Sequence, residues 1–401
     1  MKTGATTLVF EKDIKASATD CFRAFTNQSI IESWLCNSAN VDARLLTKLY
    51  LWWNSGYYVV GEFSKVEPEK EIAFSWLGRN EPGRTRVRVT FKAGKSVTHV
   101  RLEHRGIKDT ERWAKAAVGI QRGWESALNN LVVTLESGAD LRIVNRPMLG
   151  INMDDFSPED AARLGVPVSQ GIRLGSVVEG MGAQKSGLVK DDVIVEIAGT
   201  PMIGFSSISA TLQSKKPGEK IEVVYFHGPE KKTTTVELSP RPMPQIPGSV
   251  AELVLAMEDI YRQGDEALAQ ALDGVTEIES TFKPAPTEWN VREVLAHLIH
   301  NERDVQFMLH KILMYEDVFL PNNLQNRIDA TVAVYPTLAD LKLELKRAES
   351  ETLAFLRTLP EEFTSRKSSF WMLGYNLLQS NDHPVSHARQ IAETVAACRE
   401  R

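Results

Sequence analysis

The chain has 401 residues, of which 43% are hydrophobic and 25% are charged, and its formal net charge is −5. A single core seldom grows beyond about 250–300 residues, so this length predicts two to four domains, and the composition excludes a disordered chain. No apolar run approaches the roughly 20 residues that a membrane-spanning helix needs, and charges enter the N-terminus before a secretory signal could form. We therefore expect a cytoplasmic protein without a membrane span.

Charge and cysteine content exclude further classes of protein. Residues 248–401 carry 15 Lys/Arg and 24 Asp/Glu without a basic stripe, which argues against binding to nucleic acid. The cysteines Cys21, Cys36 and Cys398 lie far apart and show no zinc-binding spacing, so we expect three reduced thiols.

Residues 1–140 have the pattern of one α+β domain. Residues 7–17 alternate apolar and polar side chains as a half-buried strand does, and residues 19–35 have the apolar spacing of a helix. Short strand-like runs separated by turn residues follow at 48–53, 56–67, 70–77, 85–94 and 98–106. A long helical pattern over 112–138 places Ile120 and Trp124 on its apolar stripe. This order predicts a curved antiparallel sheet that packs against its C-terminal helix.

The runs FRAFTNQSIIESW, GEFSKVEPEKEIAFSW and GWESALNNL of this segment resemble the START-like (SRPBCC) superfamily in its AHSA type, the heat-shock-chaperone ATPase activators. The resemblance implies a helix-grip fold with a cleft between sheet and helix that binds a small apolar ligand or a partner surface. Trp34, Trp52, Trp53 and Trp76 are candidates to line the cleft. The alternative is that these tryptophans, which lie mostly on strands of a small sheet, only build its core.

Residues 141–242 alternate short, glycine-punctuated strands with two brief helices. Gly187 fits the end of the first helix, and Gly199 fits a turn that requires positive φ. The runs RPMLGINM and GIRLGSVVEGMGAQKSGLVKDDVIVEIAGTPM resemble a PDZ domain of the bacterial type, which implies a β-sandwich or barrel with two helices.

This second resemblance implies a groove for the C-terminal peptide of a partner protein. Backbone N–H groups of the loop 147–150 would bind the terminal carboxylate, strand 151–153 would pair with the peptide by β-augmentation, and helix 206–213 would form the other wall. The predicted groove residues are Met148, Leu149, Gly150, Ile151, Asn152, Met153, Ile208 and Leu212. The alternative is that the apolar members only build the core of the domain.

Four prolines within residues 239–248 predict a stiff, exposed spacer. In the following segment, 249–401, apolar residues recur at helical spacing over 249–272, 290–314, 338–359 and 384–400. This pattern predicts a four-helix bundle, with a shorter helical or lid segment at 368–380. Asn290 or Thr287 is the expected N-cap of the second helix.

Three histidines of the bundle form a candidate metal site. His383 and His387 stand four residues apart at the start of the last helix and share one face, and His297 lies on the apolar stripe of the second helix. Neutral imidazoles from two facing helices hold a transition metal ion and leave positions open for water or a thiol. The alternative is a pair of ordinary surface or capping histidines.

The arrangement EWNVREVLAHL followed by DHPVSHARQIAE also resembles the DinB-like bundle family, in which one histidine of the second helix and an HxxxH pair of the last helix bind a divalent metal. Position by position, the resemblance implicates His297, His383 and His387, with zinc or nickel as the expected ion. His300 is a substitute ligand, and Glu302 and Glu393 are candidate acid/base groups. Relatives in this family include thiol-dependent transferases.

Three functions of different classes remain open. A binding or adaptor protein would combine an apolar-ligand or chaperone-binding domain, a peptide-binding PDZ domain and a metal-binding bundle. A metal-dependent thiol transferase would carry its chemistry in the bundle, and a stress-related cochaperone would act through residues 1–140. The adaptor interpretation accounts for the most sequence and predicts a protein that is not an enzyme; if the protein is an enzyme, its activity lies in the bundle. No GxSxG-like nucleophile accompanies the PDZ-like segment, so the protease pairing familiar for bacterial PDZ domains is absent.

Overall fold

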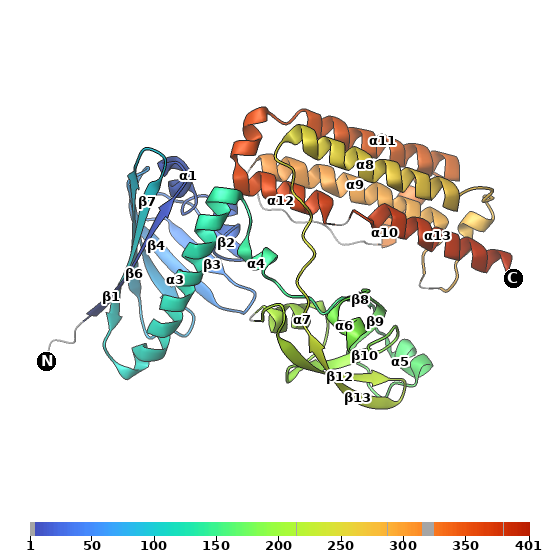
Figure 1. Cartoon of the computed structure of the whole chain (residues 1–401), viewed down its shortest axis with the longest axis horizontal. Helices are drawn as coiled ribbons and strands as arrows, with labels where there is room; N and C mark the ends of the chain where they lie inside the picture. The colour runs from blue at the N-terminus through green and yellow to red at the C-terminus, as the bar shows by residue number, and fades with distance from the viewer. Residues whose placement is uncertain (1–4, 214, 287, 315–324, 380) are drawn as a thin grey trace.

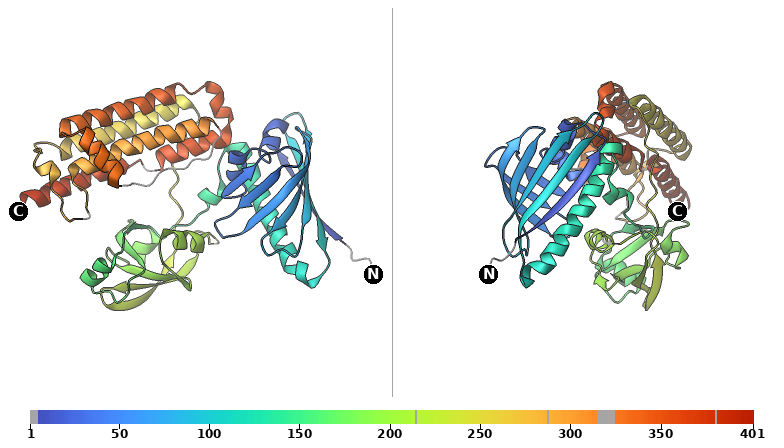
Figure 2. Two further views of the ribbon diagram at one scale, coloured as in Figure 1. Left: turned by 180° about the vertical axis from the view of Figure 1, so that it is seen from behind. Right: turned by 60° about the vertical axis from the view of Figure 1, so that its left-hand side comes forward.

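The computed structural model describes residues 5–213, 215–286, 288–314, 325–379 and 381–401. Figure 1 shows three bodies in chain order: a curved sheet with a long helix, a smaller sheet domain and a bundle of helices. The view from behind in Figure 2 also separates them, and each body has an apolar core of its own. Within the described ranges, no helix combines the length and the apolarity that crossing a bilayer requires.

The N-terminal body is a seven-stranded antiparallel sheet in the order β1-β7-β6-β5-β4-β3-β2. Its strands are β1 (Ala5–Ile14), β2 (Ser38–Val41), β3 (Lys48–Trp52), β4 (Tyr58–Glu67), β5 (Glu71–Gly78), β6 (Thr85–Ala93) and β7 (Thr98–Lys108). Helix α3 (Glu111–Ser137) buries Ile120, Trp124 and Leu128 in the core of this body. It ends at Gly138, whose φ of 85° is the left-handed conformation typical of a helix C-terminus. The predicted helix-grip arrangement is therefore present.

One local prediction for this body is wrong, and one strand was not predicted. Residues 19–35 form two short helices, α1 (Ala18–Arg23) and α2 (Gln28–Glu32), because the Asn27 side chain accepts a hydrogen bond from Ile30 N and starts a new helix. The sequence pattern also predicts no strand at β2. This strand has only four residues, too few for an alternating pattern to stand out.

The middle body is a second sheet in the order β13-β12-β10-β9-β8, with β11 paired to β10. Its strands are β8 (Ile151–Asp154), β9 (Ile172–Val177), β10 (Val193–Ile197), β11 (Thr200–Pro201), β12 (Lys220–His227) and β13 (Glu230–Glu237). The helices α5 (Pro158–Leu164), α6 (Gly182–Lys185) and α7 (Phe205–Leu212) accompany the sheet, and α4 (Leu141–Val144) precedes it. The two expected helices are present as α6 and α7. Helix α5 is additional, because Ser157 and Asp160 form a capping box that starts it.

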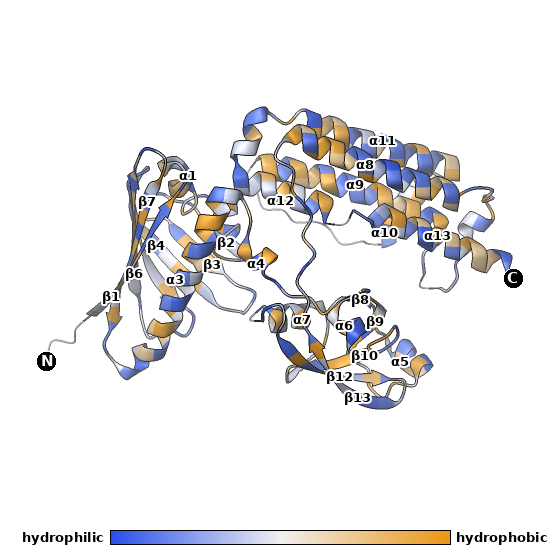
Figure 3. Ribbon diagram, in the orientation of Figure 1, coloured by the Kyte–Doolittle hydropathy of each residue, from blue (hydrophilic) through white to orange (hydrophobic). Residues whose placement is uncertain are grey.

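The C-terminal body is built on four long helices, α8 (Val250–Ala271), α9 (Val291–Leu313), α11 (Leu338–Arg357) and α13 (His383–Arg399). Apolar residues recur along each of them in Figure 3, as the predicted bundle requires. Asn290 caps α9, and the alternative cap, Thr287, lies outside the described residues. Two further helices, α10 (Gln325–Val334) and α12 (Lys367–Leu378), join the bundle, with short 3-10 turns at Glu279–Thr281 and Glu361–Ser365. The sequence pattern predicts α12 but not α10.

Helix α12 also contacts the chain outside the bundle. Lys367 Nζ donates to the carbonyl oxygen of Glu136, in the last turn of α3, over 2.7 Å, where the helix dipole favours a cation. A Cβ atom on Gly138 would lie 2.2 Å from the Lys367 carbonyl oxygen, so α3 and α12 meet as closely as glycine permits. Ile246 packs into the same core as α12, so the predicted exposed spacer is partly covered.

Candidate metal centre, peptide groove and ligand pocket

The three predicted histidines meet between α9 and α13. Nε2 of His383 lies 3.2 Å from Nε2 of His297 and 3.1 Å from Nε2 of His387. One nitrogen from each ring falls within a group only 4.8 Å across. His297 is 8% exposed, and the other two rings are half-buried. The structure therefore brings together side chains that are 86 residues apart in sequence.

Local structure explains this convergence. Helix α13 begins at His383 with Pro384 in its first turn, where the missing proline N–H would have no helical partner anyway. A Cβ atom on Gly264 of α8 would lie 2.7 Å from Pro384 Cβ, so this glycine lets the first turn of α13 come close. The indole of Trp289 packs against the His297 ring, with centroids 5.0 Å apart.

The protonation of the cluster favours a cation between the rings. His387 Nδ1 lies 2.8 Å from Gln390 Oε1, and because an amide oxygen only accepts, Nδ1 carries the proton and the Nε2 lone pair faces the other rings. Burial and the neighbouring His387 lower the pKa of His383 to about 4. Burial also lowers the pKa of His387. The two rings of α13 are thus neutral near pH 7.

The spacing of the nitrogens fits a divalent metal. Two imidazole nitrogens that bind one zinc ion tetrahedrally at about 2.0–2.1 Å lie about 3.3 Å from each other. Two of the three separations, 3.1 and 3.2 Å, are close to this value, and all three ligand nitrogens lie within 4.8 Å of one another. The donor set of three imidazoles suits zinc and nickel alike, so the residues present fit the ion that the sequence predicts.

The other predicted members of the site lie elsewhere. His300 Nε2 contacts the Arg327 carbonyl oxygen at 3.1 Å and the Thr331 hydroxyl at 3.0 Å, and His300 does not belong to the three-histidine group. Glu302 is buried where it accepts a hydrogen bond from Tyr261, and its pKa is raised by burial. Glu393 is exposed on α13. The structure therefore brings neither glutamate into the group of nitrogens.

The predicted peptide groove lies beside an open sheet edge. Strand β8 is the last strand in its sheet order and, within the described chain, pairs only with β9. Asn152 and Met153 are exposed on this strand. Ile208 and Leu212 of α7 are buried in the core against which Ile151 packs, so strand and helix share one apolar cluster.

The loop before β8 differs in part from its prediction. Pro147 has no N–H group, and the N–H of Met148 donates to the Ser239 carbonyl oxygen over 2.9 Å, so neither residue has an N–H left for a carboxylate. The N–H groups of Leu149 and Gly150 have no partner in the part of the chain that the structure describes, although both residues are buried. Gly150 has φ 83°, and a Cβ atom there would lie 2.3 Å from Met181 Cβ.

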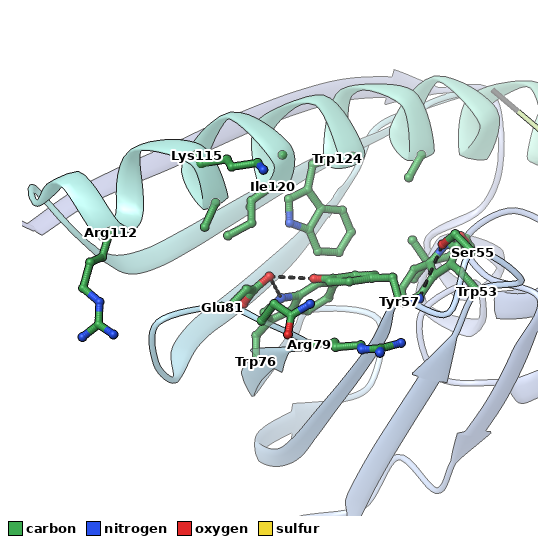
Figure 4. Close-up of a pocket in the computed structure, with 16 residues that line it drawn as sticks. Trp53, Ser55, Tyr57, Trp76, Arg79, Glu81, Arg112, Lys115, Ile120 and Trp124 are labelled. Atoms are coloured by element: carbon green, nitrogen blue, oxygen red, sulfur yellow. Dashed lines mark hydrogen bonds between the residues drawn. The ribbon is translucent and has the colours of Figure 1, made fainter. Parts of the chain in front are cut away.

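The N-terminal body contains a pocket of about 680 Å³ between α3 and the sheet. In Figure 4 the indole of Trp124 points down from the helix toward Trp76 and Tyr57 on the strand side. Trp53 and Trp76 line the pocket as predicted, whereas Trp34 and Trp52 do not, and the Trp34 side chain is 1% exposed in the core.

The space for this pocket comes from small residues on one face of α3. Ala116, Gly119, Gly123 and Ala127 follow helical spacing and all line the pocket. A Cβ atom on Gly119 or Gly123 would meet nothing within 4 Å. Each glycine inside a helix costs about 1 kcal/mol relative to alanine, and no close packing requires these two. The sequence contained this signal, two glycines on the face of a long amphipathic helix, but a count of apolar residues misses it.

The charge of the pocket mouth is positive. The Glu81 carboxylate accepts hydrogen bonds from the Tyr57 hydroxyl at 2.6 Å and the Trp76 indole at 3.2 Å, so it is engaged inside the wall. Arg79, Arg112 and Lys115 also line the pocket. Among the described residues, none of these three cations forms an ion pair.

Comparisons with known protein families identify all three bodies. A family model described as "Activator of Hsp90 ATPase homolog 1-like protein" matches residues 15–136, the PDZ domain model matches residues 147–238, and the DinB superfamily model matches residues 260–391. The chain is therefore a three-domain protein of mixed α+β fold. It carries an Hsp90-activator-like domain, a PDZ domain and a DinB-superfamily domain in that order.

Individual relatives cover smaller parts. The chain is 26% identical over 84 residues to the periplasmic pH-dependent serine endoprotease DegQ of Escherichia coli, a match that spans 21% of this chain and 18% of that protein. Among solved structures, a Mesorhizobium loti protein, MLL2253, is 25% identical over 31% of this chain and 92% of its own, with TM-score 0.29. The Aha1 dimer from Colwellia psychrerythraea is 19% identical over 33% and 96%, also with TM-score 0.29.

Proposed function

We propose that this protein is an adaptor whose PDZ domain captures the C-terminal peptide of a partner. The observation that carries this proposal is that, within the described chain, the edge of β8 is open and the neighbouring N–H groups of Leu149 and Gly150 have no partner. A peptide strand would add to the sheet at β8, and its terminal carboxylate would accept from the two N–H groups. The apolar residues Ile208 and Leu212 favour an apolar last side chain.

The test compares peptides that differ only at the C-terminus. Labelled peptides ending in an apolar residue are titrated with the full chain, and fluorescence anisotropy reports binding. We expect binding by peptides with a free carboxylate and at least tenfold weaker binding by the same peptides as C-terminal amides, because each charge-assisted hydrogen bond to the carboxylate is lost. Equal binding of both forms would contradict the groove.

A pair of variants distinguishes an effect on the carboxylate-binding loop from the strain of replacing a glycine that has positive φ. Gly150→Ala places a methyl group against Met181 at a φ of 83°, whereas Gly187→Ala imposes the same strain at φ 84° with no atom within 4 Å. Both variants are expected to lose stability because alanine is strained at positive φ, and Gly150→Ala should lose more because its methyl group also meets Met181. Only Gly150→Ala should lose peptide affinity, because only that loop faces the carboxylate.

In the N-terminal domain, the same adaptor would hold a small apolar ligand in the pocket of about 680 Å³. The unpaired cations Arg79, Arg112 and Lys115 at its mouth favour a ligand that has a negatively charged end. Aromatic walls supply the apolar contact. One protein would then bind both a small molecule in its N-terminal domain and a peptide in its PDZ domain.

A second function, a metal-dependent thiol transferase in the DinB domain, is favoured by the three converging imidazoles. His297, His383 and His387 would hold a divalent ion such as zinc or nickel, which lowers the pKa of a bound thiol or water. Gln390 orients the His387 ring, and Trp289 covers His297. Metal analysis of protein purified without added metal or affinity tag tests this function, and a protein that takes up no zinc or nickel on titration would contradict it.

A further inference from the structure

The two segments that enter and leave the PDZ domain run side by side and form a neck. Met148 and Ser239 are bridged as antiparallel partners, each accepting a hydrogen bond of 2.9 Å from the other. In an antiparallel pair, the residue two positions before one partner faces the residue two positions after the other. Arg146 lies two residues before Met148, and Arg241 lies two residues after Ser239, so both arginines flank this bridge.

The two arginines have hydroxyl partners but no carboxylate. Arg146 Nη2 donates to Ser209 Oγ of α7 over 2.6 Å, and Arg241 Nη1 donates to the hydroxyl of Tyr375 of α12 over 3.1 Å. Nε of Arg241 is buried and has no hydrogen-bond partner among the residues that the structure describes. Among the described residues neither arginine forms an ion pair, whereas the comparably buried Arg173 pairs with Asp154 at 3.1 Å.

Two like charges at this neck are unfavourable without an anion. Both side chains are half-buried, and burial, together with the facing Arg241, lowers the pKa of Arg146. Like charges that lie close together repel, and a buried charge without a counter-ion costs more than an exposed one. An anion between the guanidinium groups would remove both costs.

We propose that Arg146 and Arg241, with the hydroxyl groups of Ser209 and Tyr375, bind a small oxyanion of the phosphate class at the neck of the PDZ domain. Each guanidinium presents N–H groups in a planar fork that suits the oxygens of phosphate. Each hydroxyl accepts from its arginine and therefore keeps its own proton to donate to the anion. Two positive charges match the charge of a phosphate near pH 7.

The site would link the PDZ domain to the bundle. Ser209 lies on α7, the proposed wall of the peptide groove, and Tyr375 lies on α12, where its ring stacks on Trp371 with centroids 5.2 Å apart. An anion held by both ends would hold α7 and α12 at a fixed separation. The proposal does not depend on whether the PDZ groove binds a peptide.

Titration of the full chain with inorganic phosphate, followed by calorimetry at constant ionic strength set with chloride, tests the site. We expect saturable binding by the wild type and at least tenfold weaker binding by Arg241→Gln. Tyr375→Phe, which removes one hydroxyl and keeps the ring, should weaken binding about threefold. Lys231→Gln changes charge by the same amount on the exposed face of β13 and should leave phosphate affinity unchanged.

Thermal melting separates binding from folding. Without phosphate, Arg241→Gln is expected to melt no lower than the wild type, because it removes a like-charge contact. Only the wild type should gain melting temperature with phosphate. Equal phosphate affinity in Arg241→Gln and wild type would overturn the proposal. Displacement of phosphate by a free-carboxylate peptide but not by its amide would also overturn it, because the anion at the neck would then be the peptide carboxylate.

Discussion

The histidine cluster of the DinB domain and the pocket of the Hsp90-activator-like domain are built in opposite ways. In the cluster, three large side chains approach until Nε2 atoms lie 3.1 and 3.2 Å apart. In the pocket, side chains are missing: Gly119 and Gly123 leave open space on a helix that is otherwise packed against its sheet. The histidine cluster is therefore formed by side chains that meet, and the pocket is formed by positions on α3 that have no side chain.

The two sites should therefore respond differently to mutation. A cluster of metal ligands loses its function when any one ligand is removed, because the remaining donors no longer complete the coordination. A pocket that exists because two helix positions lack a side chain loses its function when a side chain is added, and the helix becomes more stable when its glycine is replaced. The predictions that follow use removal in one domain and addition in the other.

His383→Ala should have the largest effect. His383 Nε2 is the nitrogen that contacts both other rings, so its removal leaves two donors on different helices. We expect zinc affinity to fall at least 100-fold, beyond the 10–100-fold that follows loss of an outer partner of a metal ligand. Competition with a chromogenic zinc chelator measures the affinity.

His310→Ala is the matched control for the histidine cluster. His310 lies exposed on the same helix α9 as His297. Unchanged zinc affinity in this variant, together with loss in His383→Ala, would assign the ion to the cluster. If both variants bound zinc as the wild type does, the ion would have to sit elsewhere in the chain.

Gly123→Leu should abolish ligand binding while the helix becomes more stable. The leucine side chain would enter the pocket between Trp124 and the strands, and replacing a helical glycine contributes up to about 1 kcal/mol. We expect at least tenfold weaker binding of an anionic aromatic dye, anilinonaphthalene sulfonate, with a melting temperature equal to or above that of the wild type. Gln121→Leu adds the same side chain at an exposed position of α3 and should keep dye affinity.

A neutral naphthylamine dye sharpens this test. If the cations at the mouth select a charged end, Lys115→Gln should weaken the sulfonate dye several-fold and leave the neutral dye unchanged. Equal loss for both dyes would mean that Lys115 acts only through apolar contact of its stem.

The sequence predicted the histidine cluster better than the pocket between α3 and the sheet. The spacing of His383 and His387 places both on one face of a helix, and His297 lies on the apolar stripe of another. The resemblance to the DinB-like family then implied that the three histidines form one site. The pocket depends on Gly119 and Gly123, which in sequence are indistinguishable from tolerated helix defects. Trp124, expected on the apolar stripe of α3, is also a pocket wall, because one side of its ring faces the space that the glycines leave open.

The fold shows the same contrast between long and short patterns. The four long helices and the strands of the first sheet follow from sustained periodicity. Helix α5 and strand β2 do not, since their seven and four residues are set by local caps and by pairing with neighbours. The partly covered spacer at Ile246 depends on contact between bodies, for which no local pattern exists.

Buried titratable groups make the stability of the Hsp90-activator-like domain and that of the DinB domain depend on pH in opposite directions. In the first domain, His104 is fully buried, contacts Thr85 Oγ1 at 2.7 Å and accepts from the Trp124 indole at 3.0 Å. Burial lowers the pKa of His104 to about 4. Because the folded pKa lies below the unfolded value of about 6.5, the stability that neutral His104 contributes is lost as pH falls from 6.5 through 4. At about 1.4 kcal/mol per pKa unit, this loss is on the order of 3 kcal/mol.

His104→Gln should flatten this acid dependence. Glutamine does not titrate, so the variant should be less stable than the wild type at pH 7 and lose less stability between pH 6.5 and 4. Six of the eight tryptophans precede residue 141, so the fluorescence of denaturant unfolding reports mainly on this domain. Parallel pH profiles for variant and wild type would show that another group carries the acid response.

Glu349→Gln should have the smallest effect and the opposite sign. Glu349 of α11 is 5% exposed, and burial, followed by the nearby charge of Asp265, raises its pKa to about 7, while Lys346 beside it lowers it and Glu302 raises it. The folded pKa exceeds the unfolded value of about 4.5, so the contribution of the protonated carboxyl is complete below pH 4.5 and is lost as pH rises through 7. The variant keeps a neutral amide throughout.

Its melting temperature, followed by far-UV circular dichroism of the helices, should exceed that of the wild type by a few degrees at pH 8, and by less at pH 5. A difference that does not change with pH would mean that Lys346 keeps Glu349 ionised at both values, and the two domains would then no longer differ in the direction of their pH response.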